Sequence, residues 1–240
     1  MDLKLHEVDE FKFIETNPGK PVLMLLHGLM GALSNFDGII KGFGDKYNVV
    51  VPLLPIFELP IRKVSVKGFV EYVERFVIHK GYSDINILGN SLGGHVALLY
   101  VLSNQEKVNS LTITGSSGLF ESAMGSTFPK RGNYEYIKQK TQDTFFDPAV
   151  ATKELIDEVY ETVNDNGKVI RILATAKSAI RHNVGDDLGK ITAMNMYYNY
   201  ACNRHYKDKE KRWNDCKREI TNLFIGHNFL INHHLKKRNR

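Results

Sequence analysis

Short apolar runs alternate with stretches of helical periodicity in the first half of the chain, and this alternation restricts the possible fold more than any other feature. In 66–77 apolar residues recur at helical spacing, and Gly81 ends that pattern. Residues 8–14 alternate between polar and apolar, as in an opening strand. The apolar runs, typical of strands buried on both faces, are 22–26, 47–54, 85–88 and 111–114. Strands that alternate with helices predict an α/β fold with a parallel sheet and right-handed crossovers.

The segment 116–189 has a different pattern, with no convincing strand. Its helical stretches are 134–142, 153–164 and 168–181. A helical insertion after a strand is expected to lie as a cap over the C-terminal edge of the sheet, where open α/β folds bind their ligands. We therefore expect a core in residues 1–115, a helical cap in 116–189, and an atypical C-terminal segment in 190–240.

The basic excess of the chain lies in its last part. Residues 193–240 hold 11 Lys and Arg against 4 Asp and Glu, whereas the other 192 residues hold 21 against 23. The net charge of +5 therefore comes from this segment, and we expect no extended basic surface on the rest of the chain. It also contains both cysteines, Cys202 and Cys216, which have no metal-ligand spacing and no disulfide framework. The terminal KKRNR run belongs to no nucleic-acid-binding motif, and we expect a solvated tail.

Composition and length exclude several classes of protein. No apolar run approaches the roughly 18 residues that a membrane helix needs. The first residues, MDLKLHEVDEF, have no apolar stretch of the secretory type. We expect a cytoplasmic protein with no nucleic-acid or membrane partner.

The sequence Gly89-Asn90-Ser91-Leu92-Gly93 fits G-x-S-x-G and stands between a predicted strand and a predicted helix. This is the context of a nucleophile elbow, a sharp turn on which a serine hydroxyl is lifted clear of the backbone. The serine backbone in such a turn is strained, and glycine neighbours let the turn close. The amide of Leu92 would lie at a helix N-terminus, where the helix dipole favours a developing oxyanion. The alternative is a glycine-rich turn whose serine only caps the helix.

A second loop, His27-Gly28-Leu29-Met30-Gly31, follows the apolar run at 22–26. A short loop at this place would supply a second oxyanion donor, the amide of Leu29. The alternative is an ordinary loop with a surface histidine. The elbow motif further along the chain favours the first interpretation.

These segments resemble the α/β-hydrolase superfamily, in its small capped branch. The resemblance covers roughly residues 9–192, and its clearest parts are HGLMG, ILGNSLGGHVAL, LTITGSSG and the stretch 171–192. It implies a mostly parallel sheet with a helical cap, Ser91 as nucleophile, and the amides of Leu29 and Leu92 as oxyanion hole. The implied reaction cleaves an ester or related acyl bond of a small molecule through an acyl-enzyme, with no metal or organic cofactor. Asn90 and the double glycine are similar to capped hydrolases that cleave carbon–carbon bonds in ring-fission products.

The resemblance does not extend to residues 193–240. The family order is serine, then acid, then histidine, each after a strand, but no buried apolar run followed by G-x-x-D occurs here. We therefore expect the last strands to be either missing or atypical, and a shifted reading frame would explain such a segment. His227, at the end of the short run LFIGH, is the candidate base. The candidate acids are Asp208, Asp215 and Glu121.

His95 and His182 also lie within the resembling part of the chain. We expect His95, one turn after the elbow, to be structural, and His182 to face either the cap pocket or solvent. Because a serine without its base and acid loses several orders of magnitude in rate, a second function stays open. It is a catalytically impaired or inactive hydrolase-fold protein that acts at most as a binding module. A third possibility is a truncated chain without a stable fold; the substrate and the oligomeric state are not predicted.

Overall fold

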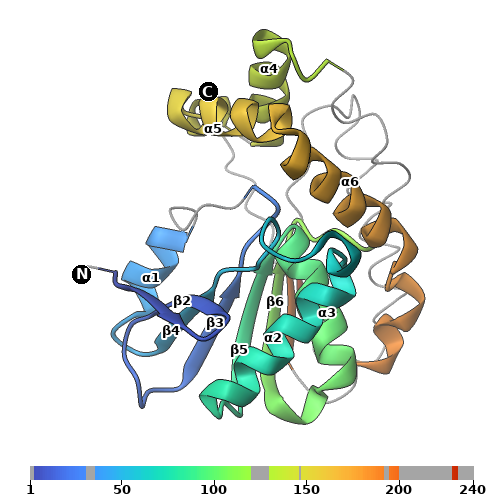
Figure 1. The fold of residues 1–240 in the computed structure, drawn as a ribbon. Helices are drawn as coiled ribbons and strands as arrows, with labels where there is room; N and C mark the ends of the chain where they lie inside the picture. The colour runs from blue at the N-terminus through green and yellow to red at the C-terminus, as the bar shows by residue number, and fades with distance from the viewer. Residues whose placement is uncertain are drawn as a thin grey trace, which may run out of the picture.

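The computed structural model describes residues 3–30, 36–119, 130–145 and 147–191, together with the strand backbones at 195–199 and 229–231. In this part of the chain an eight-stranded sheet has the order β1-β2-β4-β3-β5-β6-β7-β8 (Figure 1). The pairs β1–β2 and β2–β4 are antiparallel, and the remaining pairs are parallel. The strands are β1 (Leu5–Val8), β2 (Phe11–Glu15), β3 (Val22–Leu26), β4 (Asn48–Pro52), β5 (Ile85–Asn90), β6 (Val108–Thr114), β7 (Asn195–Asn199) and β8 (Phe229–Ile231). The predicted α/β class with a mostly parallel sheet is confirmed.

Successive side chains of the central strands point to opposite faces of the sheet, and this explains why the apolar runs that form these strands are buried on both faces. Met24 and Val50 belong to the large core cluster that includes α2 (Val66–Lys80) and α3 (Leu92–Ser103). Leu25 and Val49 belong to the cluster on the other face, which includes Ile40 of α1 (Asp37–Phe43). The sheet therefore lies between α1 and the α2–α3 pair (Figure 1).

The prediction of a single opening strand at 8–14 is wrong, because the chain reverses within it. The structure has a hairpin in which β1 and β2 pair from Leu5↔Ile14 to Val8↔Phe11. Asp9 takes the left-handed value φ 52°, which aspartate tolerates better than most side chains, and so the chain reverses there. The turn contains no glycine or proline and was therefore missed in the sequence.

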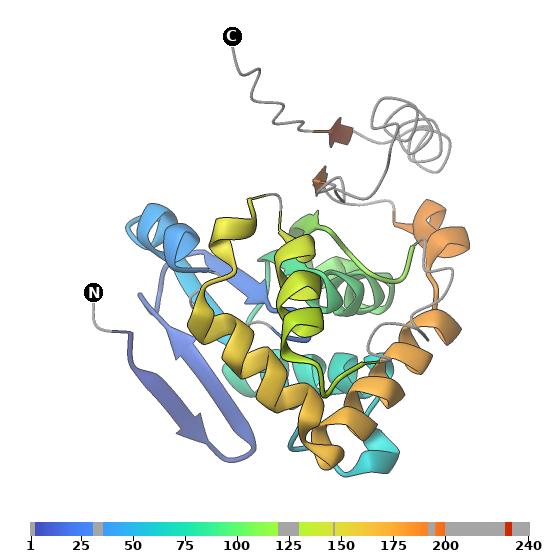
Figure 2. The same ribbon diagram turned by 90° about the horizontal axis from the view of Figure 1, so that it is seen from above.

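Three further helices follow β6 in the chain: α4 (Tyr134–Thr144), α5 (Lys153–Asn164) and α6 (Asn166–Arg181). Each begins at a side-chain cap, from Asn133, Thr152 and Asp165 respectively. Helices α4 and α5 lie beyond the C-terminal ends of the parallel strands, and the view from above shows them across that end of the molecule (Figures 1 and 2). Short 3-10 helices cover Ile61–Lys63, Gln105–Lys107, Pro148–Val150 and Gly185–Lys190. The division of the chain at residues 115 and 189 stays a prediction.

The far edge of the sheet is formed by two short strands. β7 pairs with β6 from Ser110↔Asn195 to Thr114↔Asn199, and β8 pairs with β7 over three residues. The sequence predicts that the last strands are either missing or atypical. The structure contains both strands, so they are atypical and not missing. β8 begins beyond the run that ends at His227, and the run itself lies outside the described residues. In the part of the chain that the structure describes, no helix has the length and apolar character that crossing a membrane requires.

Candidate active site

Ser91 occupies the sharp turn between β5 and α3 that the motif predicts. Its backbone has φ 52° and ψ −117°, a conformation that costs a residue with a side chain about 1–3 kcal/mol. The Ser91 N–H donates to the Thr114 carbonyl at 3.0 Å, and its own carbonyl accepts from the N–H groups of Gly94 (3.1 Å) and Ser117 (3.2 Å). The end of β6 and the first turn of α3 therefore hold the strained turn in place.

Two glycines of the motif regions are required by close backbone approach. A Cβ at Gly93 would collide with the carbonyl of Leu26 at the end of β3. A Cβ at Gly28 would lie 3.2 Å from the Cβ of Ser91, tighter than an ordinary contact. The loop after β3 and the elbow are thus packed backbone to backbone, and the two predicted motif regions meet in space.

The side chain of His27 holds this loop and is not on the surface. The residue is 8% exposed; its Nε2 accepts from the Leu54 N–H at 2.9 Å, and its Nδ1 lies 2.8 Å from the Gly28 carbonyl. Since Nε2 accepts, Nδ1 carries the proton and donates to that carbonyl. Burial lowers the pKa of His27, more than the bond to Gly28 raises it. The ring is therefore neutral and occupied at both nitrogens, so the alternative of a surface histidine is wrong.

The geometry of the Gly28 carbonyl determines the direction of the next amide. In a trans peptide the C=O and the following N–H point in opposite directions. No cis peptide occurs in the described residues. The His27 ring fixes the Gly28 carbonyl, and it thereby fixes the Leu29 N–H to point away from the ring. Sequence reasoning named Leu29 but missed the role of His27, whose position directly before the glycine was the available signal.

Asn90 is a second residue whose role the sequence did not reveal. Its side-chain amide donates to the carbonyl of Thr114 at 3.2 Å and to the hydroxyl of Thr114 at 2.9 Å. Thr114 therefore binds both the side chain before the serine and the backbone of the serine itself. This arrangement clamps β5 to β6 at the point where the elbow begins.

His95 and His182 connect α3 to α6. The ring of His95 is fully buried, and its Nε2 lies 2.8 Å from the carbonyl of His182. Burial lowers the pKa of His95. His182 lies 2.9 Å through Nδ1 from the carbonyl of Ser178, whose hydroxyl accepts from the N–H of Val66 at the start of α2. Both histidines hold helices together here, in agreement with the structural role expected for His95.

The candidate base and acids lie outside the described residues. These are His227, Asp208, Asp215 and Glu121. Their roles stay predictions. Within the described ranges, no group of three His, Cys, Asp or Glu side chains is arranged to hold a metal ion.

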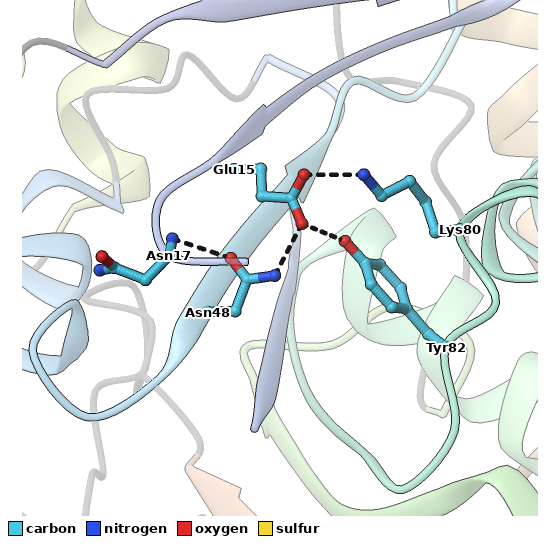
Figure 3. Close-up of polar contacts among 5 residues, drawn as sticks. All are labelled: Glu15, Asn17, Asn48, Lys80 and Tyr82. Carbon is cyan, nitrogen blue, oxygen red and sulfur yellow. Dashed lines mark hydrogen bonds and ion pairs between the residues drawn. The ribbon is translucent and has the colours of Figure 1, made fainter. Parts of the chain in front are cut away.

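A polar cluster at the other end of the strands, where the parallel strands β4 and β5 begin, was not foreseen. Glu15, at the end of β2, accepts from Lys80 and Asn48 at 2.7 Å each and from the hydroxyl of Tyr82 at 2.6 Å (Figure 3). It borders a cavity of about 380 Å³. Burial alone would raise the pKa of Glu15, but the bonds from Lys80, Tyr82 and Asn48 outweigh burial and lower it. The cluster joins β2, β4 and the end of α2, and every oxygen of the carboxylate is occupied.

Comparison with known proteins agrees with this geometry. The family profile of the alpha/beta hydrolase fold matches residues 21–153, and the chain belongs to this family. The crystal structure of MGS-MChE2, an alpha/beta hydrolase enzyme from the metagenome of lagoon sediments at Mar Chica, Morocco, is 34% identical with a TM-score of 0.71. That similarity covers 95% of this chain and 87% of the other.

Curated relatives are more distant. The 2-hydroxy-6-oxo-6-phenylhexa-2,4-dienoate hydrolase of Comamonas testosteroni is 25% identical over 225 residues, which are 80% of this chain and 76% of that protein. The magnesium-chelatase 30 kDa subunit of Rhodobacter capsulatus is 30% identical over 121 residues, 48% of this chain and 42% of that protein. The chain thus spans less than half the length of that relative. The family is established by these matches, and the reaction is not.

Proposed function

We propose that the chain is a serine hydrolase that cleaves an ester or related acyl bond of a small molecule, a carbon–carbon bond next to a carbonyl included. The observation that carries this proposal is the strained turn at Ser91 with Gly28 packed against it. A positive φ is uncommon and unfavourable for a residue with a side chain, and strain of this kind clusters at functional sites. The similarity to a ring-fission-product hydrolase supports the carbon–carbon reading.

In the proposed reaction, the Ser91 oxygen attacks the acyl carbon while a base takes the hydroxyl proton. The negative charge that develops on the acyl oxygen is stabilised by two amides, those of Leu92 and Leu29. Leu92 is the first residue of α3, where the N–H has no acceptor within the helix. Collapse of the intermediate expels the leaving group, which receives the proton, and water then releases the acyl group from Ser91.

His27 supports the second oxyanion donor in this proposal. Its hydrogen bond to the Gly28 carbonyl points the Leu29 N–H away from the ring, and Gly28 lies beside Ser91. His27 is thus a positioning residue and not the base, because both of its nitrogens are occupied. We propose His227 as the base. Helices α4 and α5 would act as the cap over the substrate, and the cytoplasm is the proposed location.

The proposal is tested by turnover of short p-nitrophenyl esters. We expect a burst of nitrophenol that approaches one equivalent, followed by slower steady-state release, because an acyl-enzyme accumulates. Ser91→Ala should abolish both phases, and His227→Ala should lower the rate by several orders of magnitude. Ser116→Ala changes a neighbouring serine whose hydroxyl donates to the Ser117 carbonyl at 2.8 Å, and should keep the burst. A folded protein without any burst or turnover would favour a binding module.

A further inference from the structure

Two consecutive residues in the loop after β3 are buried against different parts of the molecule. Leu29 is half-buried against the large core cluster of the sheet and of helices α2 and α3. Met30 is half-buried against the small cluster of Ile137, Val159 and Val163, which belongs to α4 and α5. The loop therefore joins the sheet to the helices that lie beyond its end (Figure 2).

We propose that Met30 is a positioning residue which makes the orientation of the Leu29 amide depend on the seating of α4 and α5. The inference rests on the proposed function, in which that amide is an oxyanion donor. Its direction has two restraints. On the N-terminal side the His27 ring holds the Gly28 carbonyl, and on the C-terminal side the side chains of Leu29 and Met30 hold the chain.

The physical reason is the sensitivity of an oxyanion hole to small displacements. Loss of one donor costs roughly 100- to 1,000-fold in rate, and a shift of about 1 Å in a catalytic group can cost about 100-fold. The C-terminal restraint depends on the apolar contact between Met30 and the cluster of helices α4 and α5. When α4 and α5 are seated, Met30 is held and the amide keeps its direction; when they move, this restraint is lost. Hydrolysis would then proceed only with these helices in place.

Methionine suits this contact but is not essential to it. Its unbranched side chain packs against the cluster of Ile137, Val159 and Val163, and leucine has a similar volume. Met30→Leu should therefore preserve the restraint, whereas Met30→Ala should remove the apolar contact and with it the restraint on the Leu29 amide. The comparison of these two variants separates the contact from the loop conformation.

The test measures the second-order rate of fluorophosphonate labelling at Ser91 in the full chain. We expect Met30→Ala to lower the rate at least tenfold and Met30→Leu to stay within about threefold of the unchanged protein. In an Ile137→Ala background, where the partner surface is already damaged, Met30→Ala should cost less than threefold. Ester kinetics should show the loss in kcat with KM changed less than twofold. Circular dichroism shows that each variant is folded.

The outcomes are distinguishable. Labelling of Met30→Ala at the unchanged rate would overturn the role of Met30 while leaving Ser91 as nucleophile. Equal costs of Met30→Ala with and without Ile137 would show a local effect of the loop and would also overturn the coupling. An unchanged protein that never labels at Ser91 would remove the proposed function, and the inference would fall with it.

Discussion

The N–H of Ser91 donates to the carbonyl of Thr114 at 3.0 Å, so the residue at the elbow is held by the end of the neighbouring strand. The side-chain amide of Asn90 donates to the same carbonyl at 3.2 Å. Two hydrogen bonds from consecutive residues to one acceptor fix the C-terminal end of β5 against β6. They supply part of the free energy that maintains the unfavourable φ of 52° at Ser91.

Relief of this strain should be measurable. Glycine adopts a positive φ without steric cost, so Ser91→Gly should be more stable than Ser91→Ala by about 1 kcal/mol, after the entropy that glycine loses on folding. Urea unfolding of the two variants gives the difference. Because both lack the hydroxyl, both should fail to hydrolyse esters. If Ser91→Gly were no more stable than Ser91→Ala, the strain at this position would be absent.

Gly93 and Gly38 form a matched pair for the packing of the elbow. A Cβ at Gly93 collides with the Leu26 carbonyl, whereas a Cβ at Gly38, within α1, meets nothing within 4 Å. We expect Gly93→Ala to be destabilised by more than about 3 kcal/mol or to yield insoluble protein. Gly38→Ala should be unchanged or stabilised by up to about 1 kcal/mol, through helix propensity. Comparable melting curves for the two variants would contradict the close approach of β3 and α3.

The buried carboxylate of Glu15 should matter for stability and not for catalysis. Its side chain is 8% exposed, and Glu15→Gln leaves the Lys80 ammonium without its ion partner. We expect a loss of about 2 kcal/mol in the free energy of unfolding. Glu7→Gln, in an ion pair with Lys12 where both side chains are more than half exposed, should change it by less than about 0.5 kcal/mol. Urea titrations measure both. Ser91 labelling of the folded Glu15→Gln protein should be unaffected, because this cluster lies where the parallel strands begin and Ser91 lies where β5 ends.

The two buried histidines predict a loss of stability in mild acid. The pKa values of His27 and His95 in the folded state lie below the ordinary value of 6.5, chiefly through burial. Well above pH 6.5 both are neutral in either state, so their contribution is complete. As the pH falls below 6.5 the unfolded chain takes up protons that the folded chain does not, and stability decreases until the folded pKa values are passed.

Unfolding in urea at pH 7.5, 6.5, 5.5 and 5.0 measures this dependence. His95→Gln removes one of the two groups and should flatten the decline between pH 6.5 and 5. His79→Gln changes a histidine whose side chain is 33% exposed and serves as the control. Stability that stayed constant over this range would mean that the two rings are protonated in the folded protein.

The sheet and its helices followed from local patterns, and the contacts of the site only partly did. The limits of α5 agree with the predicted 153–164, because its apolar residues recur at helical spacing between the Thr152 cap and Asp165. Ser91 was found because strain at a strand-to-helix turn demands glycines nearby. The hairpin turn at Asp9 was missed, since it contains no glycine or proline. The role of His27 depends on its partner Leu54, which is distant in sequence, so its position before Gly28 was the one local signal.

The contacts of Glu15 show the same limit. Its partners Asn48, Lys80 and Tyr82 come from separate elements, and no local pattern in the sequence marks a charge that will be buried. The atypical edge strands β7 and β8 have another cause. The sequence of β7, NMYYN, lacks the apolar run that predicts a buried strand, and β8 has only three residues. β7 pairs with β6 and β8 pairs with β7, contacts between segments that are distant in sequence.

The nucleophilic serine is the claim on which the account depends, and covalent labelling tests it most directly. The full chain is incubated with a fluorophosphonate, its intact mass is measured, and the modified peptide is located by fragmentation. The account predicts one adduct per chain, at Ser91, and none in Ser91→Ala, with Ser116→Ala labelled like the unchanged protein. A folded chain that remains unmodified, or an adduct on a different residue, would contradict it.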